Sequence, residues 1–385
     1  MIFRRASKGS PVVRALTAAL VGSAGSAAAE PPSIRGVGDL PGGEFVSLVE
    51  GVSGDGRVVI GSSSTNAGAA GFRWTSADGI QGLESLPGQT ESFAAGVNAD
   101  GTAIVGASFG SSSVDASYRW TATGGMQSLG TRPGSTLGSH ATGVSADGLV
   151  VVGVGHIPGG REAYRWTQAG GMQGLGSLVT ATVDSFARAV SGDGNVVVGF
   201  SGPEAFRWTS TGGMQGIGDL AGGGFESHAF DVNAGGSVVV GYSQSANGFE
   251  AFRWTSAGGM TGLGDLAGGI FSSSASVVSA DGSAVFGTGV VASPDSQRAF
   301  VWDSVRGMRD LEQVLTDDFG LDLDGWRLEG VTGVSDDLSV IVGNGRDPSG
   351  RIAGYVVVVP EPTSLAPLAV AGALLLRRRV THRAQ

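Results

Sequence analysis

The chain has no cysteine and few charged, aromatic or histidine residues. Without cysteine among 385 residues, neither a disulfide framework nor a thiolate metal site can form. The four histidines are dispersed along the chain and do not indicate a metal centre, so we expect neither a metal nor another cofactor: His140, His156, His228 and His382.

The charged residues are unevenly distributed. Eight basic residues lie near the two ends: Arg4, Arg5, Lys8, Arg14, Arg377, Arg378, Arg379 and Arg383. The body between these ends contains no lysine and carries a formal charge of about −16. Such a surface repels phosphates and anionic lipid, so we expect no nucleic-acid partner.

Glycine is abundant, with 69 residues, and 41% of the chain is hydrophobic. This composition is too apolar for a disordered chain and too rich in glycine for a helical one. One phrase recurs, and its clearest copy begins A-T-G-V-S-A-D-G-L-V-V-V-G and continues through E-A-Y-R-W-T to G-G-M-Q-G-L-G-S-L. Its tryptophans recur at intervals of 46, 46, 42, 46 and 48 residues: Trp74, Trp120, Trp166, Trp208, Trp254 and Trp302.

Each repeat indicates four short strands. In the clearest copy, strands are expected at 141–145 and 149–154, joined by a tight Asp-Gly turn. A third strand carries the tryptophan, and a Gly-Gly turn leads to a fourth strand at 172–175. Strand alternation places the Arg and the Trp of the R-W pair on opposite faces. We interpret Trp as a core residue between repeats, and four strands in about 46 residues are typical of a β-propeller blade.

The hairpin motif occurs seven times, with Gly235 replacing Asp in the fifth copy: Ser53, Asn98, Ser145, Ser191, Asn233, Ser279 and Ser335. A fourth-strand motif at 34–40 precedes every hairpin, whereas the last copy, 331–359, ends before its own fourth strand. The sequence therefore predicts an all-β, seven-bladed propeller over 30–359, closed by the N-terminal strand completing the last blade. An open β-solenoid is the alternative, and it needs no such complementary ends.

The repeat pattern is interrupted once, at about 309–320. Apolar residues at helical spacing, closed by Gly320, predict a short inserted helix. An acidic cluster follows, which is either a solvated helix end or a weak calcium site: Asp317, Asp318, Asp322 and Asp324.

Both ends have the features of targeting segments. Residues 1–29 combine a basic start, a small apolar stretch and Ala27-Ala28-Ala29, which is the layout of a secretory signal peptide. Residues 360–385 contain Pro360-Glu361-Pro362, a short apolar helix and Arg377-Arg378-Arg379. This order resembles the PEP-CTERM sorting signal. The 12-residue apolar run Leu365–Leu376 is too short for a permanent transmembrane helix, so with the arginines after it we expect transient membrane insertion through 364–376. The resemblance implies removal of the tail by an exosortase-type enzyme in a Gram-negative bacterium that makes exopolysaccharide.

The repeats resemble the HAF family of extracellular repeat proteins, named for a His-Ala-Phe signature. The aligned phrases are Glu204-Ala205-Phe206-Arg207-Trp208 and Glu250-Ala251-Phe252-Arg253-Trp254, with Glu at the histidine position. His228-Ala229-Phe230 has the signature letters but lies in a different predicted strand. The resemblance supports the repeat assignment and supplies no activity.

No catalytic motif in the sequence has the structural context that its chemistry requires. Ser108 lies in a G-x-S-x-G match, but no helix is predicted after it, as a nucleophile elbow requires. His140 and His228 occupy equivalent places two repeats apart, too distant to share an ion. The R-W pairs are the remaining binding candidate. We therefore expect a non-enzymatic envelope or matrix module that binds exopolysaccharide or surface proteins. The alternative is a polysaccharide hydrolase or lyase on the same fold.

Overall fold

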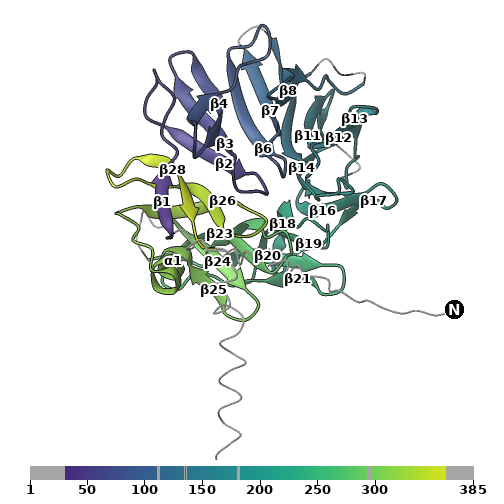
Figure 1. The fold of residues 1–385 in the computed structure, drawn as a ribbon. Helices are drawn as coiled ribbons and strands as arrows, with labels where there is room; N and C mark the ends of the chain where they lie inside the picture. The colour runs from purple at the N-terminus through teal and green to yellow at the C-terminus, as the bar shows by residue number, and fades with distance from the viewer. Residues whose placement is uncertain are drawn as a thin grey trace, which may run out of the picture.

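The computed structural model describes residues 31–110, 113–133, 135, 137–179, 183–292 and 297–360. The fold is all-β except for one helix, and its antiparallel sheets are arranged in chain order around a common centre (Figure 1). No helix in these ranges has the length and apolar character needed to cross a bilayer. The predicted signal peptide and all of the predicted sorting segment except Pro360 lie outside the described residues.

Five sheets each contain four strands that are consecutive in the chain and pair in sequence order. The first two are β6 (Glu91–Val97), β7 (Ala103–Gly110), β8 (Ser113–Thr121), β9 (Gly125–Ser128), and β10 (Ser139–Val144), β11 (Val150–Ile157), β12 (Gly160–Thr167), β13 (Gly171–Gly174). The next two are β14 (Ser185–Val190), β15 (Val196–Ser201), β16 (Glu204–Thr209), β17 (Gly213–Gly216), and β18 (Gly222–Val232), β19 (Val238–Ser245), β20 (Gly248–Thr255), β21 (Gly259–Gly262). The fifth is β22 (Ser273–Val278), β23 (Ala284–Val290), β24 (Gln297–Asp303), β25 (Gly307–Asp310).

The remaining strands form one eight-stranded sheet that combines both ends of the described chain. Its strands are β1 (Ser33–Gly36), β2 (Ser47–Val52), β3 (Val59–Thr65), β4 (Gly68–Thr75), β5 (Gly79–Gly82), β26 (Arg327–Val334), β27 (Val340–Arg346) and β28 (Ile352–Val358). β1 pairs antiparallel with β28 from Ser33↔Val358 to Gly36↔Tyr355. A single parallel bridge, Ser47↔Ala353, connects β2 with β28.

The strands of the third repeat confirm the sequence-based assignment: all four predicted strands are present, with small shifts at their ends. The Asp-Gly turn between β10 and β11 places Gly148 at φ 72°, a left-handed conformation that glycine adopts without strain. Ser145 Oγ donates to Asp147 Oδ1 (2.6 Å) and accepts from the Val150 N–H (3.0 Å). The hairpin motif therefore encodes a closed turn with a buried serine or asparagine.

A buried aromatic ring facing a glycine is the repeated core element. In the fourth repeat Phe206 on β16 lies opposite Gly199 on β15, and a Cβ at Gly199 would lie 1.8 Å from the Phe186 carbonyl oxygen. Only glycine therefore fits where β14 approaches β15. The equivalent aromatic residues are all fully buried: Phe72, Tyr118, Tyr164, Phe206, Phe252, Phe300 and Tyr355.

The tryptophans expected in the repeat core are less buried than these rings. Only Trp74 is buried, and the other five are half-buried at the edges of clusters between neighbouring sheets. Trp166 packs toward the preceding sheet with Val105, whereas the Arg165 Nε–H donates to the Gly194 carbonyl of the following sheet (3.2 Å). The R-W pair thus spans both interfaces of its sheet, because adjacent side chains point to opposite faces.

The one helix, α1 (Leu311–Phe319), lies inside the segment where the sequence predicts it. Asp310 caps its N-terminus by accepting from the Glu312 N–H (2.8 Å). Gly320 ends it at φ 67°, and its N–H donates to the Thr316 carbonyl (3.0 Å). Its apolar residues Leu311, Val314 and Leu315 pack onto the core between the last two sheets.

We expect Phe206→Ala to lower the free energy of unfolding by about 3–5 kcal/mol, because truncating a buried aromatic side chain leaves a cavity. Urea unfolding followed by tryptophan fluorescence measures this change. Phe225→Ala is the matched control, since Phe225 is 55% exposed and its loss should change stability by less than about 0.5 kcal/mol. Equal effects at the two positions would contradict the assignment of this ring to the core.

Candidate functional site at the central channel

The first strand of each repeat lines a central cavity of about 370 Å³. Each of these strands contains a bulge, which leaves one extra residue unpaired with the second strand: Glu50, Ala95, Thr142, Arg188, Phe230, Ser276 and Thr332. All but Ala95 line the cavity. Their side chains differ in size and charge, whereas the positions around them repeat. The bulge therefore directs the variable part of the repeat toward the channel.

Several polar groups of the channel hold neighbouring strands together. Thr142 Oγ1 donates to the Ala187 carbonyl (2.9 Å), and Ser276 Oγ donates to the Val331 carbonyl (2.6 Å). Asp231 accepts from the N–H of Val278 on the next sheet (2.9 Å). Burial raises the pKa of Asp231 to about 7, although its bonds from the Val278 and Val232 N–H groups oppose this shift. These three side chains have structural roles.

Glu50 and Arg188 are the channel residues of opposite charge at bulge positions. Both are reached by solvent in the channel, but both are surrounded by protein walls. Burial accordingly raises the pKa of the Glu50 carboxyl and lowers the pKa of the Arg188 guanidinium, which stays charged at neutral pH. Arg188 also connects the channel to an aromatic group, because it lies over the rings of Phe200 (5.6 Å) and Phe230 (5.5 Å).

This group, the aromatic cluster, spans the sheets β14–β17 and β18–β21. It consists of Phe186, Phe200, His228, Phe230, Tyr242 and Phe249. Phe186 stacks on Phe200 with centroids 4.8 Å apart, and Phe200 stacks on His228 at 4.1 Å and 8° between the ring planes. His228 Nδ1 lies 3.2 Å from the Tyr242 hydroxyl. The rings form one continuous, partly exposed surface across the interface between two sheets.

The cluster is not required by the repeat. The cross-strand pairs Phe186–Phe200 and His228–Tyr242 correspond to Leu48–Ser62 in the first repeat and to Ser274–Thr288 in the sixth. Since those repeats form the same strands without aromatic residues there, sheet formation does not explain the cluster.

Two arginines give the cluster a cationic border within an otherwise acidic body. Arg161 lies over Phe186 at 4.3 Å and is paired with Asp184 (3.1 Å), and Arg188 lies over Phe200 and Phe230. Burial lowers the pKa of His228. The Arg188 charge lowers it further, whereas the Glu226 carboxylate raises it. His228 is therefore neutral at pH 7 and can accept or donate one hydrogen bond at each ring nitrogen.

A smaller group of rings lies on the preceding two sheets. Phe109 contacts Phe93 (5.4 Å) and His140 (5.2 Å), and His140 contacts His156 (5.6 Å). His140 Nε2 lies 3.3 Å from Asp115 Oδ2. Both first-strand histidines singled out in the sequence thus have polar partners, and each belongs to a different aromatic group.

The other candidates from the sequence have local structural explanations. Ser108 is a buried residue of β7 that accepts from the Leu86 N–H (3.1 Å) and donates to the Glu91 carbonyl (2.9 Å). Asp318 is paired with Arg306 and Arg309, each at 3.3 Å. In the described part of the chain, no three His, Asp or Glu side chains are arranged to share a metal ion, including Asp317, Asp318, Asp322 and Asp324.

Comparisons with known proteins address the fold. No protein-family model matches the chain, and no curated protein matches it in sequence. The oligogalacturonate lyase of Vibrio parahaemolyticus superposes with a TM-score of 0.55 at 12% identity, covering 86% of this chain and 98% of that one. An oligogalacturonate lyase in complex with manganese has a TM-score of 0.51 at 13% identity, covering 87% and 98%. TolB from Acinetobacter baumannii has a TM-score of 0.45 at 12% identity over 66% of this chain, and the match spans 63% of that TolB chain. The fold is a β-propeller like that of the two lyases.

We expect Asp231→Asn to change the pH dependence of stability. The folded chain binds the Asp231 proton more tightly than the unfolded chain does. This contribution to stability is complete below the ordinary carboxyl pKa and is lost as the pH rises through about 7. The stability of the variant relative to the natural chain should therefore increase from pH 5 to about pH 7 and then level off. The expected rise is roughly 3 kcal/mol, since about two pH units contribute about 1.4 kcal/mol each. Urea unfolding at several pH values measures this trend.

Asp147→Asn is the control for this trend. The Ser145 hydroxyl and the Leu149 N–H lower the pKa of Asp147, so its contribution is lost only in acid, as the pH falls below its ordinary pKa. Its effect should be constant between pH 5 and pH 8. A constant effect for Asp231→Asn as well would show that Asp231 does not titrate in this range.

Proposed function

We propose that the sheets form seven blades and that β1 completes the last one. The single bridge Ser47↔Ala353 resembles the isolated parallel bridges between successive sheets, such as Arg161↔Asp184, which supports dividing the eight-stranded sheet at that point. The Leu40 N–H donates to Ser63 Oγ (3.1 Å), as the Leu86 N–H donates to Ser108 Oγ in the next repeat. β1 and the segment after it, as far as Leu40, thus have the contacts of a fourth strand and its connection to the first complete repeat.

A cysteine pair tests this closure, because the chain has no other thiol. Ser33→Cys with Val358→Cys joins residues that lie directly opposite each other. The disulfide should form within one chain and raise the free energy of unfolding by several kcal/mol, since it closes a very long loop. An open solenoid would keep the two ends apart and leave both thiols free in a thiol-labelling assay.

We propose that the protein is exported to the cell envelope or extracellular matrix and binds polysaccharide without catalysing a reaction on it. The layouts of residues 1–29 and 360–385 support export and subsequent removal of the tail by an exosortase-type enzyme. The observation that carries the binding role is the aromatic cluster beside the channel, with Arg161 and Arg188 at its border.

The chemistry of the cluster suits a sugar chain. Phe200 is stacked against both Phe186 and His228, so the partly exposed rings offer mainly their apolar edges to the C–H groups of pyranose rings. The Tyr242 hydroxyl and His228 offer hydrogen bonds beside them. The two guanidiniums can bind hydroxyl or carboxylate oxygens. Rings that already stack on one another lose little conformational entropy on binding.

A polysaccharide hydrolase or lyase is the second candidate, and the His228–Tyr242 pair favours it. The two side chains lie within hydrogen-bond reach (3.2 Å), and His228 is neutral near pH 7, so it could act as a general base. The likeness to oligogalacturonate lyases is compatible with this candidate but bears on the fold alone.

The deciding experiment incubates residues 30–359 with the exopolysaccharide of the source bacterium and measures retention and depolymerisation together. We expect retention without depolymerisation. Phe186→Ala and Arg188→Ala should each weaken binding about tenfold or more, because the first removes a ring of the stack and the second a guanidinium that lies over two rings. Phe225→Ala, which removes an exposed ring outside the cluster, should leave binding unchanged. Depolymerisation that is lost in His228→Ala would favour the enzyme, and retention unaffected by the cluster variants would refute this site.

A further inference from the structure

An apolar groove lies between the sheet β22–β25 and the strands β26–β28, at the end where the turns β22–β23 and β26–β27 lie. Its volume is about 620 Å³, and helix α1 forms one wall with Leu311, Val314, Leu315 and Phe319. Val301, Leu338 and Val359 contribute to its lining from the strands and the last hairpin. Val305, at its edge, is 80% exposed. Most of the other apolar lining residues are buried beneath the groove, so Val305, Leu338 and Phe319 are the large apolar residues that solvent reaches there. A partner that covered them would bury apolar surface.

The groove exists because three residues depart from the repeat together. At four other interfaces an arginine donates to the carbonyl of the glycine in the next hairpin, as Arg165 does to Gly194 (3.2 Å) and Arg119 to Gly148 (2.9 Å). At this interface Val301 stands in the arginine position and Leu338 in the glycine position. Ala284 replaces the valine that packs against this turn at most other interfaces, such as Val150 against Gly194. A polar contact has thus become an open apolar surface.

Leu338 also departs from the repeat in its backbone. It has φ 61°, whereas the six equivalent hairpin residues with φ between 68° and 76° are all glycines: Gly56, Gly101, Gly148, Gly194, Gly236 and Gly282. A leucine in the left-handed region is strained, because its Cβ approaches the backbone carbonyl. Strain that persists at one hairpin of a repeat, with the side chain lining a groove, points to a function for that side chain.

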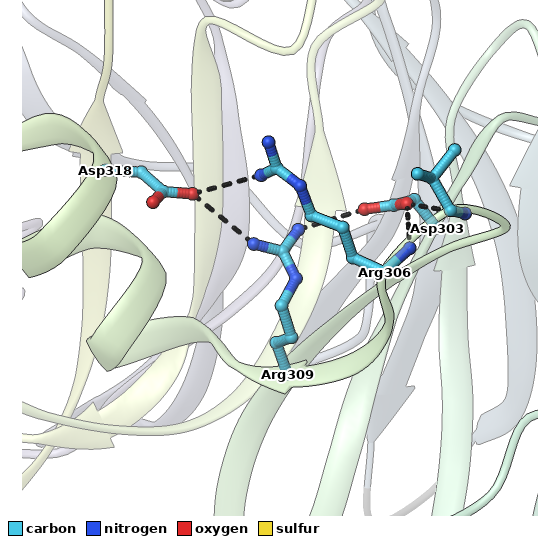
Figure 2. A network of polar contacts seen from close by, with 5 residues as sticks. Asp303, Arg306, Arg309 and Asp318 are labelled. Carbon is cyan, nitrogen blue, oxygen red and sulfur yellow. Dashed lines mark hydrogen bonds and ion pairs between the residues drawn. The ribbon is translucent and has the colours of Figure 1, made fainter. Parts of the chain in front are cut away.

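The rim of the groove is acidic and well ordered by ion pairs. Asp303 accepts from the N–H groups of Val305 (2.9 Å) and Arg306 (2.8 Å), which fixes the turn that exposes Val305. Figure 2 shows Arg309 between Asp303 and Asp318, at 2.9 Å and 3.3 Å, with Arg306 on the same Asp318 carboxylate. The lining itself contains four aspartates and one arginine: Asp281, Asp303, Asp336, Asp337 and Arg309. Cationic groups are therefore attracted to this rim.

The chain leaves the described fold at the groove. Val359, which lines it, is followed by Pro360 and then by the 25 residues 361–385. That tail contains the apolar run Leu365–Leu376 and, directly after it, Arg377-Arg378-Arg379. We propose that the groove binds this apolar run of the same chain before the tail is processed, with the arginines against the acidic rim. The occupant is tethered at the groove, so its effective concentration is high. The contact would shield an aggregation-prone segment until a membrane takes it up.

The proposal is tested on residues 30–385, which keep the unprocessed tail and in which introduced cysteines have no competitors. Val305→Cys with Leu368→Cys places one thiol at the groove and one in the tail. Arg57→Cys with Leu368→Cys is the matched control, because Arg57 is exposed in the hairpin that flanks the last strands on their other side. In dilute solution with a mild oxidant, we expect the intrachain disulfide to form at least tenfold faster in the Val305 pair than in the control pair.

Two further variants separate docking from mere proximity. Leu338→Gly restores the residue of the other hairpins and should reduce the advantage of the Val305 pair at least threefold, while circular dichroism confirms the fold. Replacing Arg377, Arg378 and Arg379 by Gln should also reduce the rate advantage of the Val305 pair, and high salt should reduce that advantage in the natural tail. The proposal would be overturned by equal rates for both cysteine pairs or by no effect of Leu338→Gly. Disulfides that form mainly between chains would also overturn it, since a second copy would then be the occupant.

Discussion

The packing of one aromatic ring against one glycine is the constraint on which the other features of each sheet depend. The ring lies on the third strand and the glycine on the second, as Phe206 and Gly199 do. A missing Cβ lets the first strand approach so closely that its carbonyl oxygen fills the space, and this close approach coincides with the bulge that follows. The bulge in turn leaves one residue per first strand unpaired with the second strand, and all of these residues except Ala95 line the channel. Core packing and the variable channel lining are therefore two results of the same contact.

This coupling separates the positions that build the fold from those available for binding. The hairpin serine or asparagine, the glycine and the buried ring repeat because each satisfies a fixed steric or hydrogen-bonding need. The bulge residues vary from Glu50 to Arg188 and Phe230, although two of them, Thr142 and Ser276, also bond to neighbouring strands. The aromatic cluster arises where two neighbouring repeats both place ring pairs at the ends of the first two strands away from the hairpin, and of its rings Phe230 lines the channel.

The repeat length, the four strands, the Asp-Gly hairpins and the helix ending at Gly320 could be predicted from the sequence because each depends on residues close together in the chain. Strand alternation predicts tryptophan between neighbouring repeats, and the six tryptophans do lie in clusters between sheets. The sequence does not indicate that the ring two positions earlier, opposite a glycine, is the more deeply buried side chain. The aromatic cluster could not be predicted. Phe186, Phe200, His228 and Tyr242 are separated by 14 to 28 residues, and their stacking depends on the offset between adjacent sheets.

The last interface shows why departures from a repeat are informative. In a repeat protein each interface between neighbouring repeats contains the same packing and hydrogen-bonding groups. Replacing one residue there therefore leaves a cavity or an unpaired hydrogen-bond donor. Here the arginine, the valine and the glycine of the repeat are replaced together by Val301, Ala284 and Leu338, and α1 is inserted at the same place. The replacements compensate one another in size and polarity, so the interface stays closed beneath the groove. The last repeat could have diverged simply because it lies at the end of the fold. That explanation would not place the helix, the strained leucine and the acidic rim at the same interface.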